Sequence, residues 1–216
     1  MEQELQLEGH VMTAQTALKL DEHYSWKDYL GWPDSERWEI IAGKAYAMSP
    51  SPLPVHQTIA LALGAKMSTF FKGKKCRVFV APMDVRLSDE DVVQPDLLVV
   101  CDPKQIRTYI EGPPALVVEI VSESSVRHDR MHKSELYARC GVKEYWIVTP
   151  FPCMVEVFLL EGEHYTWWKT FGHEETLTSP VFADLNIALP EVFEFALEQY
   201  AAGPTVVKEP PTHYNK

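Results

Sequence analysis

The sequence has no long apolar run, and its amino-terminal end lacks the features of an export signal. No stretch approaches the roughly 18 to 20 apolar residues that a membrane-spanning helix needs. The opening MEQELQLEGH is acidic and polar, whereas a secretory signal begins with basic residues and continues with an apolar segment. These features predict a soluble, cytoplasmic protein that does not enter a membrane.

Cysteine and positive charge are also scarce. The four cysteines, at positions 76, 101, 140 and 153, form no C-x-x-C pair, so the sequence predicts neither a structural zinc site nor a disulfide framework. The formal net charge of −11 argues against a protein that coats nucleic acid non-specifically. Local basic clusters remain at 72–77 and 127–133, although such runs are also typical of solvated surfaces.

The 216 residues have ordinary globular composition, and their number favours one domain over two. We expect a single domain over residues 13–200, a flexible amino-terminal segment over 1–12 and a flexible carboxyl-terminal tail over 201–216.

Apolar periodicity and turn residues predict alternating helices and strands. Predicted helices cover 13–30, 56–71, 126–140 and 190–200. Predicted strands cover 37–41 and 44–48 around the Ala42-Gly43 turn, then 76–82, 83–87, 95–100, 115–121 and 144–148, with a further hairpin over 154–171. The order strand, helix, strand over 115–148 indicates a parallel crossover. The predicted fold is α/β, a mixed central sheet flanked by helices with added β-hairpins.

Three acidic residues interrupt these otherwise apolar strands. Glu119 lies within ALVVEIV, Asp96 opens LLVV, and Glu39 lies within WEII. A buried carboxylate without a partner is costly, so each needs a cation or hydrogen-bond donors. Two carboxylates from neighbouring strands, with a backbone carbonyl such as that of Ile120, suit Mg²⁺ or Mn²⁺. Lys133 is the candidate for the lysine that assists the attacking water.

Each of these residues also has an ordinary structural explanation. A salt bridge or a solvent-facing strand end accounts for Glu119 or Glu39, and Pro-Asp is common at turns. Lys133 lies four residues after Asp129 and is suited to a helical ion pair with it. By the same reasoning, Tyr137 is a core residue and His56 a helix-cap residue.

The chain resembles the PD-(D/E)XK nuclease superfamily through Pro95-Asp96 and through the E-I-V sequence at 119–121. It is more closely similar to the Uma-type putative restriction endonuclease family, on RWEIIAGKAYAMSP, QPDLLVV, PPALVVEIVSESS and GVKEYWIV. The resemblance implies a restriction endonuclease-like core in which Asp96, Glu119 and Glu39 lie near a metal ion. Asp84, His56, Asp129 and Tyr137 are candidates for supporting roles.

The sequence departs from the superfamily pattern at Val121, where the lysine of E-x-K is expected. Residues two apart on a strand share a face, so Val121 occupies the lysine's place beside Glu119. The resemblance implies that the lysine has moved to the following helix, at Lys133.

These residues lead to a principal hypothesis, metal-dependent hydrolysis of DNA phosphodiesters by a homodimer. The rival from another class is a catalytically inactive nuclease-fold module that binds a protein or nucleic-acid partner, and Val121 and the net charge of −11 favour it. A zinc site on His128 and His132, spaced as in zinc hydrolases, is a third possibility, but the sequence offers no clear third ligand.

Overall fold

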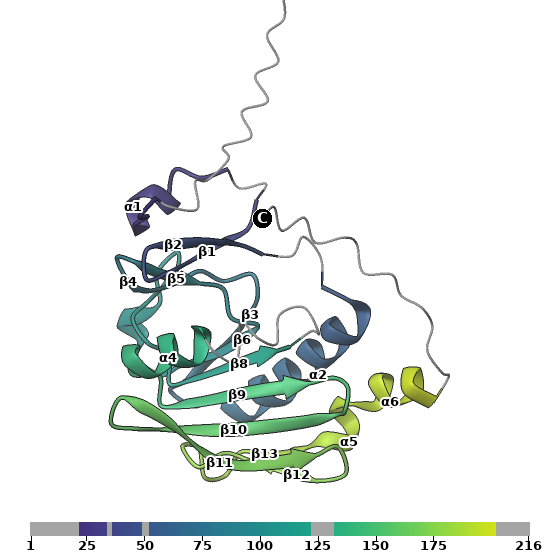
Figure 1. The fold of residues 1–216 in the computed structure, drawn as a ribbon. Coiled ribbons are helices and arrows are strands. Elements are labelled where there is room, and N and C mark those ends of the chain that lie inside the picture. The colour runs from purple at the N-terminus through teal and green to yellow at the C-terminus, as the bar shows by residue number, and fades with distance from the viewer. Residues whose placement is uncertain (1–21, 34–35, 49–51, 122–131, 202–216) are drawn as a thin grey trace, which may run out of the picture.

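The computed structural model describes residues 22–33, 36–48, 52–121 and 132–201. Its helices are α1 (Trp26–Tyr29), α2 (Pro54–Phe71), the short 3₁₀ helix η1 (Pro103–Gln105), α4 (Ser134–Cys140), α5 (Leu189–Val192) and α6 (Glu194–Ala201). Its strands are β1 (Trp38–Ile41), β2 (Lys44–Ala47), β3 (Arg77–Val80), β4 (Val85–Ser88), β5 (Asp91–Val93), β6 (Leu97–Val100), β7 (Ile110–Glu111), β8 (Leu116–Ile120), β9 (Glu144–Thr149), β10 (Met154–Glu161), β11 (His164–Gly172), β12 (Thr176–Thr178) and β13 (Asn186–Ala188). The predicted mixed α/β architecture is confirmed (Figure 1).

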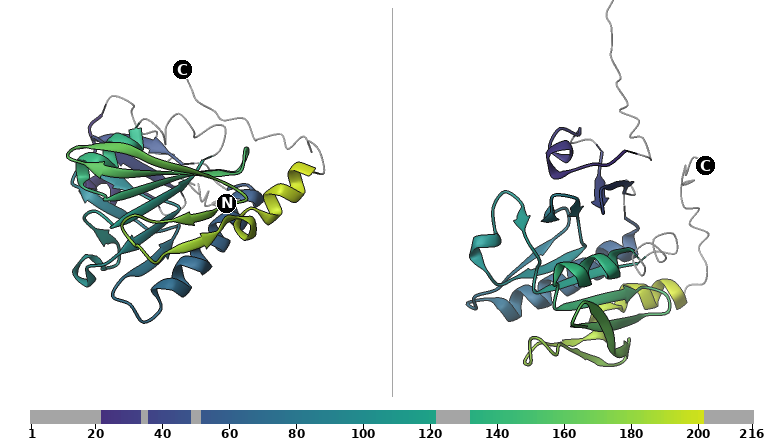
Figure 2. Two further views of the ribbon diagram at one scale, coloured as in Figure 1. Left: turned by 90° about the horizontal axis from the view of Figure 1, so that it is seen from below. Right: turned by 60° about the vertical axis from the view of Figure 1, so that its left-hand side comes forward.

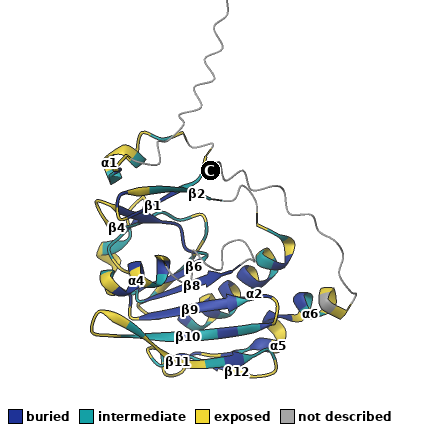
Figure 3. Ribbon diagram, viewed as in Figure 1, coloured by how far each residue is buried: buried dark blue, intermediate teal, exposed yellow. Residues whose placement is uncertain are grey.

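A six-stranded sheet, ordered β11-β10-β9-β8-β6-β3, forms the centre of the molecule. Strands β8 and β9 are parallel, as the predicted crossover requires, and the other pairs are antiparallel. All five residues of β8 are buried, which fits its inner position in the sheet (Figure 3). The near-continuous apolar run that predicted a central strand therefore has the burial expected of one.

A second sheet, ordered β2-β1-β5-β4-β7, lies beside the first. Its β1–β2 hairpin has the predicted turn, in which Ala42 and Gly43 both have positive φ, at 50° and 74°. Positive φ at both central residues is the geometry that matches the twist of a two-residue hairpin.

The two faces of the central sheet pack against different partners. Alternate residues such as Val118 and Ile120 lie in a core with the long helix α2, which runs along this face in Figure 2. The intervening residues, such as Val117 and Val121, pack with α4 and with residues of the second sheet. Because side chains alternate along a strand, Glu119 belongs to the second face.

Several predicted elements differ from the observed ones. Only Trp26–Tyr29 is helical within the described part of the predicted helix 13–30, and the predicted last helix is split into α5 and α6. The short strands β5, β7, β12 and β13 were not predicted, because two or three residues carry too little periodicity. The predicted flexible segments 1–12 and 201–216 lie outside the described residues except Ala201, which ends α6.

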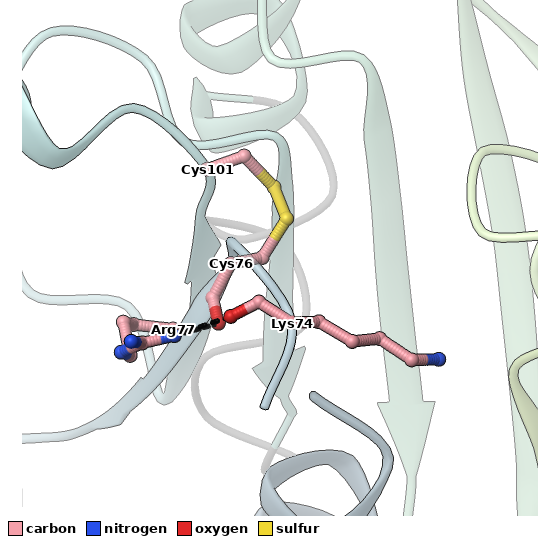
Figure 4. The surroundings of a disulfide bond; sticks show 4 residues. All are labelled: Lys74, Cys76, Arg77 and Cys101. Atoms are coloured by element: carbon pink, nitrogen blue, oxygen red, sulfur yellow. Dashed lines mark hydrogen bonds between the residues drawn. A yellow bond between two sulfur atoms is a disulfide. The ribbon is translucent and has the colours of Figure 1, made fainter. Parts of the chain in front are cut away.

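A disulfide joins Cys76 to Cys101, contrary to the expectation from cysteine spacing (Figure 4). The two residues flank β3 and β6 one step beyond the Arg77–Val100 pair, so the ladder brings their Cα atoms to 4.0 Å. Sequence spacing alone could not reveal this contact, because it depends on the pairing of the strands. Among the helices of the described residues, none is long and apolar enough to cross a membrane.

Candidate functional site

Glu119 is buried on the face of β8 that packs towards α4. Its side chain is only 4 % exposed, and it projects into a layer that is mainly apolar. One carboxylate oxygen, Oε1, accepts hydrogen bonds from Lys133 Nζ at 3.1 Å and from the Tyr137 hydroxyl at 2.6 Å. The partner that a buried carboxylate requires is therefore supplied by the start of α4.

Lys133 joins two carboxylates from different sheets. Its Nζ lies 3.0 Å from Oε1 of Glu39 on β1 and 3.1 Å from Oε1 of Glu119 on β8, and all three side chains are almost fully buried. Buried charges are tolerated when they are paired and hydrogen-bonded, and here one ammonium faces two carboxylates.

Tyr137 is fully buried behind this cluster. Burial, followed by the nearby charges of Glu119 and Glu39, raises its pKa well above the usual value. The hydroxyl therefore stays protonated at neutral pH and donates its hydrogen bond to Glu119.

Asp96 lies at the mouth of β6, next to the strand that carries Glu119. Leu97 pairs with Val118, so one step further along the antiparallel ladder Asp96 stands opposite Glu119. Its Oδ2 accepts a hydrogen bond from the Ile120 backbone N–H at 2.7 Å, and His56 Nε2 lies 3.1 Å from its Oδ1. The Asp96 side chain is 17 % exposed, so neither acidic residue is turned towards bulk solvent.

His56 approaches Asp96 from the first turn of α2. Its other ring nitrogen, Nδ1, is buried and has no hydrogen-bond partner among the described residues. The geometry suits a histidine that orients the Asp96 carboxylate, and His56 is therefore more than a surface cap.

Gln94 links this region to a second set of polar side chains. Its backbone N–H donates to Oε1 of Glu39 at 3.0 Å, and its side-chain amide donates to the Tyr29 hydroxyl and to Oδ1 of Asp84. The Arg37 guanidinium donates twice to the Gln94 side-chain oxygen. Burial and then the Asp84 hydrogen bond raise the pKa of Tyr29, which keeps its hydroxyl protonated as a donor to Asp84.

Carboxylate and carbonyl oxygens are the donor types that a hard divalent cation prefers. Asp96 and Glu119 offer carboxylate oxygens from opposed positions on adjacent strands, and the Ile120 backbone lies beside both. Mg²⁺ commonly uses one or two carboxylates and completes its shell with water. Within the described ranges no three His, Cys, Asp or Glu side chains converge as ligands.

The structure brings four of the predicted site residues together. Lys133 contacts both Glu39 and Glu119, Tyr137 donates to Glu119, and Asp96 with His56 borders them through Ile120. Asp84 joins indirectly through Gln94. Asp129 lies outside the described residues, as do His128 of the zinc hypothesis and most of the basic cluster at 127–133.

The second basic cluster, at 72–77, lies away from the acidic residues. Arg77 begins β3, whereas Asp96 is next to the other end of that strand, where the Ala81 N–H donates to the Asp96 carbonyl. Four strand residues separate the two ends, roughly 13 Å at the usual rise per residue.

Sequence reasoning missed Arg37, Gln94 and Tyr29. The available signal was positional, because Arg37 precedes Glu39 by two residues and Gln94 directly precedes Pro95-Asp96. A polar residue between two buried strands needs hydrogen-bond partners, just as an acidic one does.

Comparisons with known proteins concern the family and the fold of the chain. The family model Uma2, described as "Putative restriction endonuclease", matches residues 26–190. An uncharacterized protein of Synechocystis sp. (strain ATCC 27184 / PCC 6803 / Kazusa) is 27 % identical over 137 residues, which cover 61 % of this chain and 72 % of the relative. The crystal structure of a putative nuclease belonging to DUF820 from Anabaena variabilis ATCC 29413 has a similar fold, with a TM-score of 0.65 and 17 % identity over 80 % of this chain and 98 % of that one.

Proposed function

Because this chain belongs to the Uma2 family of putative restriction endonucleases, we propose that it is a metal-dependent nuclease that hydrolyses phosphodiester bonds of DNA. The observation that carries the proposal is the buried Glu119 carboxylate, bonded to Lys133 and standing opposite Asp96 on the adjacent strand. A buried acidic cluster with one ammonium and an adjoining carboxylate is an arrangement suited to phosphoryl chemistry.

Asp96 and Glu119 are the proposed ligands of Mg²⁺ or Mn²⁺, together with the Ile120 carbonyl. When bound, such an ion polarises a phosphate and makes a coordinated water more acidic. Hydrogen bonds preorganise the two carboxylates. His56 and the Ile120 N–H orient Asp96, and the Tyr137 hydroxyl orients Glu119. Fixed ligands reduce the reorganisation needed during reaction.

Lys133 is the proposed residue that assists the attacking water. Its ammonium can donate a hydrogen bond to that water or to the developing negative charge on the phosphate. Glu39 and Glu119 hold the ammonium from two sides. In this scheme Glu39 positions the lysine and is not itself a reacting group.

A homodimer is part of the same proposal, because cutting both strands of a duplex requires two active sites and C₂ dimers are the commonest oligomers. The cytoplasmic location remains a prediction from the sequence. Light scattering of the purified chain, alone and with duplex DNA, tests the dimer directly.

The nuclease proposal is tested by incubating supercoiled plasmid with the full chain in EDTA, Mg²⁺, Mn²⁺ or Zn²⁺. We expect nicking or linearisation with Mg²⁺ or Mn²⁺ and none with EDTA. Asp96→Asn and Glu119→Gln should each abolish cleavage, and titration calorimetry should show loss of Mn²⁺ binding. Activity restored by Zn²⁺ alone would instead support the zinc site on His128 and His132.

The second candidate function is an inactive nuclease-fold module that binds a partner. The observation favouring it is Val121, a buried apolar residue on the face where the superfamily pattern has its lysine. In that case Asp96→Asn and Glu119→Gln should leave DNA binding unchanged, and Mg²⁺ should not raise the melting temperature of the wild type.

A further inference from the structure

Arg37 presents a guanidinium whose positive charge is not neutralised by an acidic side chain. Its Nε and Nη2 donate to the same acceptor, the neutral Gln94 side-chain oxygen, at 2.9 and 2.7 Å. Within the described ranges no carboxylate oxygen lies within 4.0 Å of it. The group is half-buried and oriented, yet it keeps its full charge and an Nη1 that no contact to the described residues occupies.

The other described arginines differ in this respect. Arg86 and Arg107 both pair with Glu111, and Arg139 pairs with Asp91. Arg77 bonds only backbone carbonyls, but it is exposed and lies at the end of β3 remote from Asp96. Arg37 therefore combines an unneutralised charge with a fixed orientation close to the acidic cluster.

Gln94 couples Arg37 to that cluster. The side chain of Gln94 holds the guanidinium, and its backbone N–H holds Oε1 of Glu39, the same oxygen that contacts Lys133. Arg37 also precedes Glu39 by two residues, a spacing that puts side chains on one face of an extended segment. The guanidinium thus borders the carboxylates without forming an ion pair with them.

We propose that Arg37 is a phosphate-binding residue of the active site, which holds a backbone phosphate of the nucleic-acid substrate beside the metal carboxylates. The inference rests on the proposed function and extends it by one binding group. Guanidinium is planar, is always charged and matches phosphate oxygens with paired N–H donors. An anionic substrate approaching an acidic cluster needs such a cation, since the charge of Lys133 is already shared by two glutamates.

A purely structural role would give Arg37 a different signature. In that case the guanidinium serves only to fix Gln94, which in turn orients Tyr29 and Asp84. Replacing Arg37 would then lower stability but would not alter how binding depends on salt. The salt dependence of binding distinguishes the structural role from the phosphate-binding role. Each phosphate contact makes the negative slope of log K against log salt steeper by about 0.9 for duplex DNA, because it releases counterions.

The test measures fluorescence anisotropy of a labelled 20-base-pair duplex with the full chain in Ca²⁺, over a series of salt concentrations, with gels to verify that the duplex stays intact. We expect Arg37→Gln to weaken binding. The slope of log K against log salt should become less steep by about 0.9, which corresponds to one phosphate contact. Arg37→Lys, which keeps the charge, should retain most of the slope. Arg107→Gln is the matched control, because Arg107 is exposed and already paired with Glu111, and its slope should stay close to the wild-type value.

The outcomes separate this proposal from the proposed function. If the wild type binds and Arg37→Gln keeps the wild-type slope, the phosphate assignment is wrong while the nuclease proposal stands. If the wild type shows no salt-dependent binding of nucleic acid, both are wrong. Thermal melting identifies any unfolded variant. If Arg37→Gln does not fold, Arg37→Met and Arg37→Lys are compared instead. The decrease in the steepness of the salt dependence is then expected for Arg37→Met and not for Arg37→Lys.

Discussion

The ammonium of Lys133 lies 3.1 Å from Oε1 of Glu119, although fourteen residues separate the two in sequence. The strand position that would normally bring a lysine beside Glu119 is Val121, which is buried in the same layer. The amino group therefore reaches the carboxylate from the start of α4 instead of from β8. Its position relative to the carboxylate, and not its place in the strand, is what the proposed chemistry requires.

Removing the ammonium should cost both stability and activity. Lys133→Met leaves Glu39 and Glu119 buried with no cation between them, and breaking a buried ion pair in this way costs about 3–5 kcal/mol. We expect the free energy of unfolding in urea to fall by that amount and DNA cleavage to fall at least ~100-fold. Exposed Lys169, which pairs with Glu175 at the surface, provides the control, and Lys169→Met should change neither quantity appreciably.

The lysine should also function from its more usual strand position. In the double variant Val121→Lys/Lys133→Met, residue 121 shares a strand face with Glu119, so its amino group should reach the same carboxylate. We expect cleavage to recover partly relative to Lys133→Met. A double variant that is folded by circular dichroism, binds Mn²⁺ and yet remains as inactive as Lys133→Met would refute the assignment of the amino group as the catalytic element.

The Tyr137 hydroxyl should stabilise the buried Glu119 side chain. Tyr137→Phe removes a 2.6 Å hydrogen bond to a buried carboxylate while keeping the ring that packs against Tyr145. Lys133 still donates to this oxygen, so the loss is that of one hydrogen bond to a charged group, about 1.5–3 kcal/mol, and urea denaturation should show a decrease in that range. The matched control is Tyr165→Phe, because the Tyr165 hydroxyl donates to the Val142 carbonyl and not to a carboxylate. Equal Mn²⁺ affinities for wild type and Tyr137→Phe would argue against a role in fixing the ligand.

Much of the fold was predictable because its signals are local. The run LVVEI predicted a central strand, the Ala42-Gly43 pair predicted a hairpin, and Gly141 predicted the end of α4. The contacts that depend on pairing were not predictable. The Cys76–Cys101 bond requires the β3–β6 register, which no spacing in the sequence reveals.

In the candidate site too, some residues were predictable from local sequence and others were not. Glu39, Asp96 and Glu119 were identifiable because an acidic residue in an apolar strand is unusual, and Lys133 was a candidate that the family resemblance then favoured. Arg37 and Gln94 were missed because arginine and glutamine near strand ends are common on ordinary surfaces. Only the hydrogen bonds from both residues towards Glu39 and its neighbours distinguish them.

The disulfide should contribute to stability through the unfolded chain. Cys76 and Cys101 are separated by 25 residues, and the loss of loop-closure entropy for such a loop corresponds to about 3.5 kcal/mol in the chain-entropy model. We expect reduction with dithiothreitol to lower the melting temperature, and Cys76→Ser/Cys101→Ser to melt at the reduced value with or without reductant. Mass spectrometry after alkylation counts the free thiols. Four alkylated cysteines without reductant would show that the bond does not form in the isolated protein.

Glu144 should make stability depend on pH in a direction opposite to that of a salt-bridged carboxylate. It is fully buried at the start of β9, and its neutral donors are the Trp146 indole, the Ser179 hydroxyl and the Val181 N–H. Burial raises the pKa of Glu144 above its usual value of 4.5. Between the unfolded and the folded pKa, the folded chain holds more protons than the unfolded chain, so the contribution of this group to stability falls as pH rises through that window. Glu144→Gln keeps the shape without the charge and should remove this component.

The measurement is a set of urea denaturation curves from pH 4 to pH 8 for wild type and Glu144→Gln. Because other groups titrate in the same range, the informative quantity is the difference between the two free energies of unfolding at each pH. That difference should shift in favour of Glu144→Gln as pH rises above about 4.5, with a slope of at most about 1.4 kcal/mol per pH unit for a single proton. Glu161→Gln, an exposed carboxylate at the end of β10, serves as the control and should give a nearly constant difference. A constant difference for Glu144→Gln as well would mean that Glu144 titrates alike in the folded and unfolded chain, and that its three donors offset the whole cost of burial.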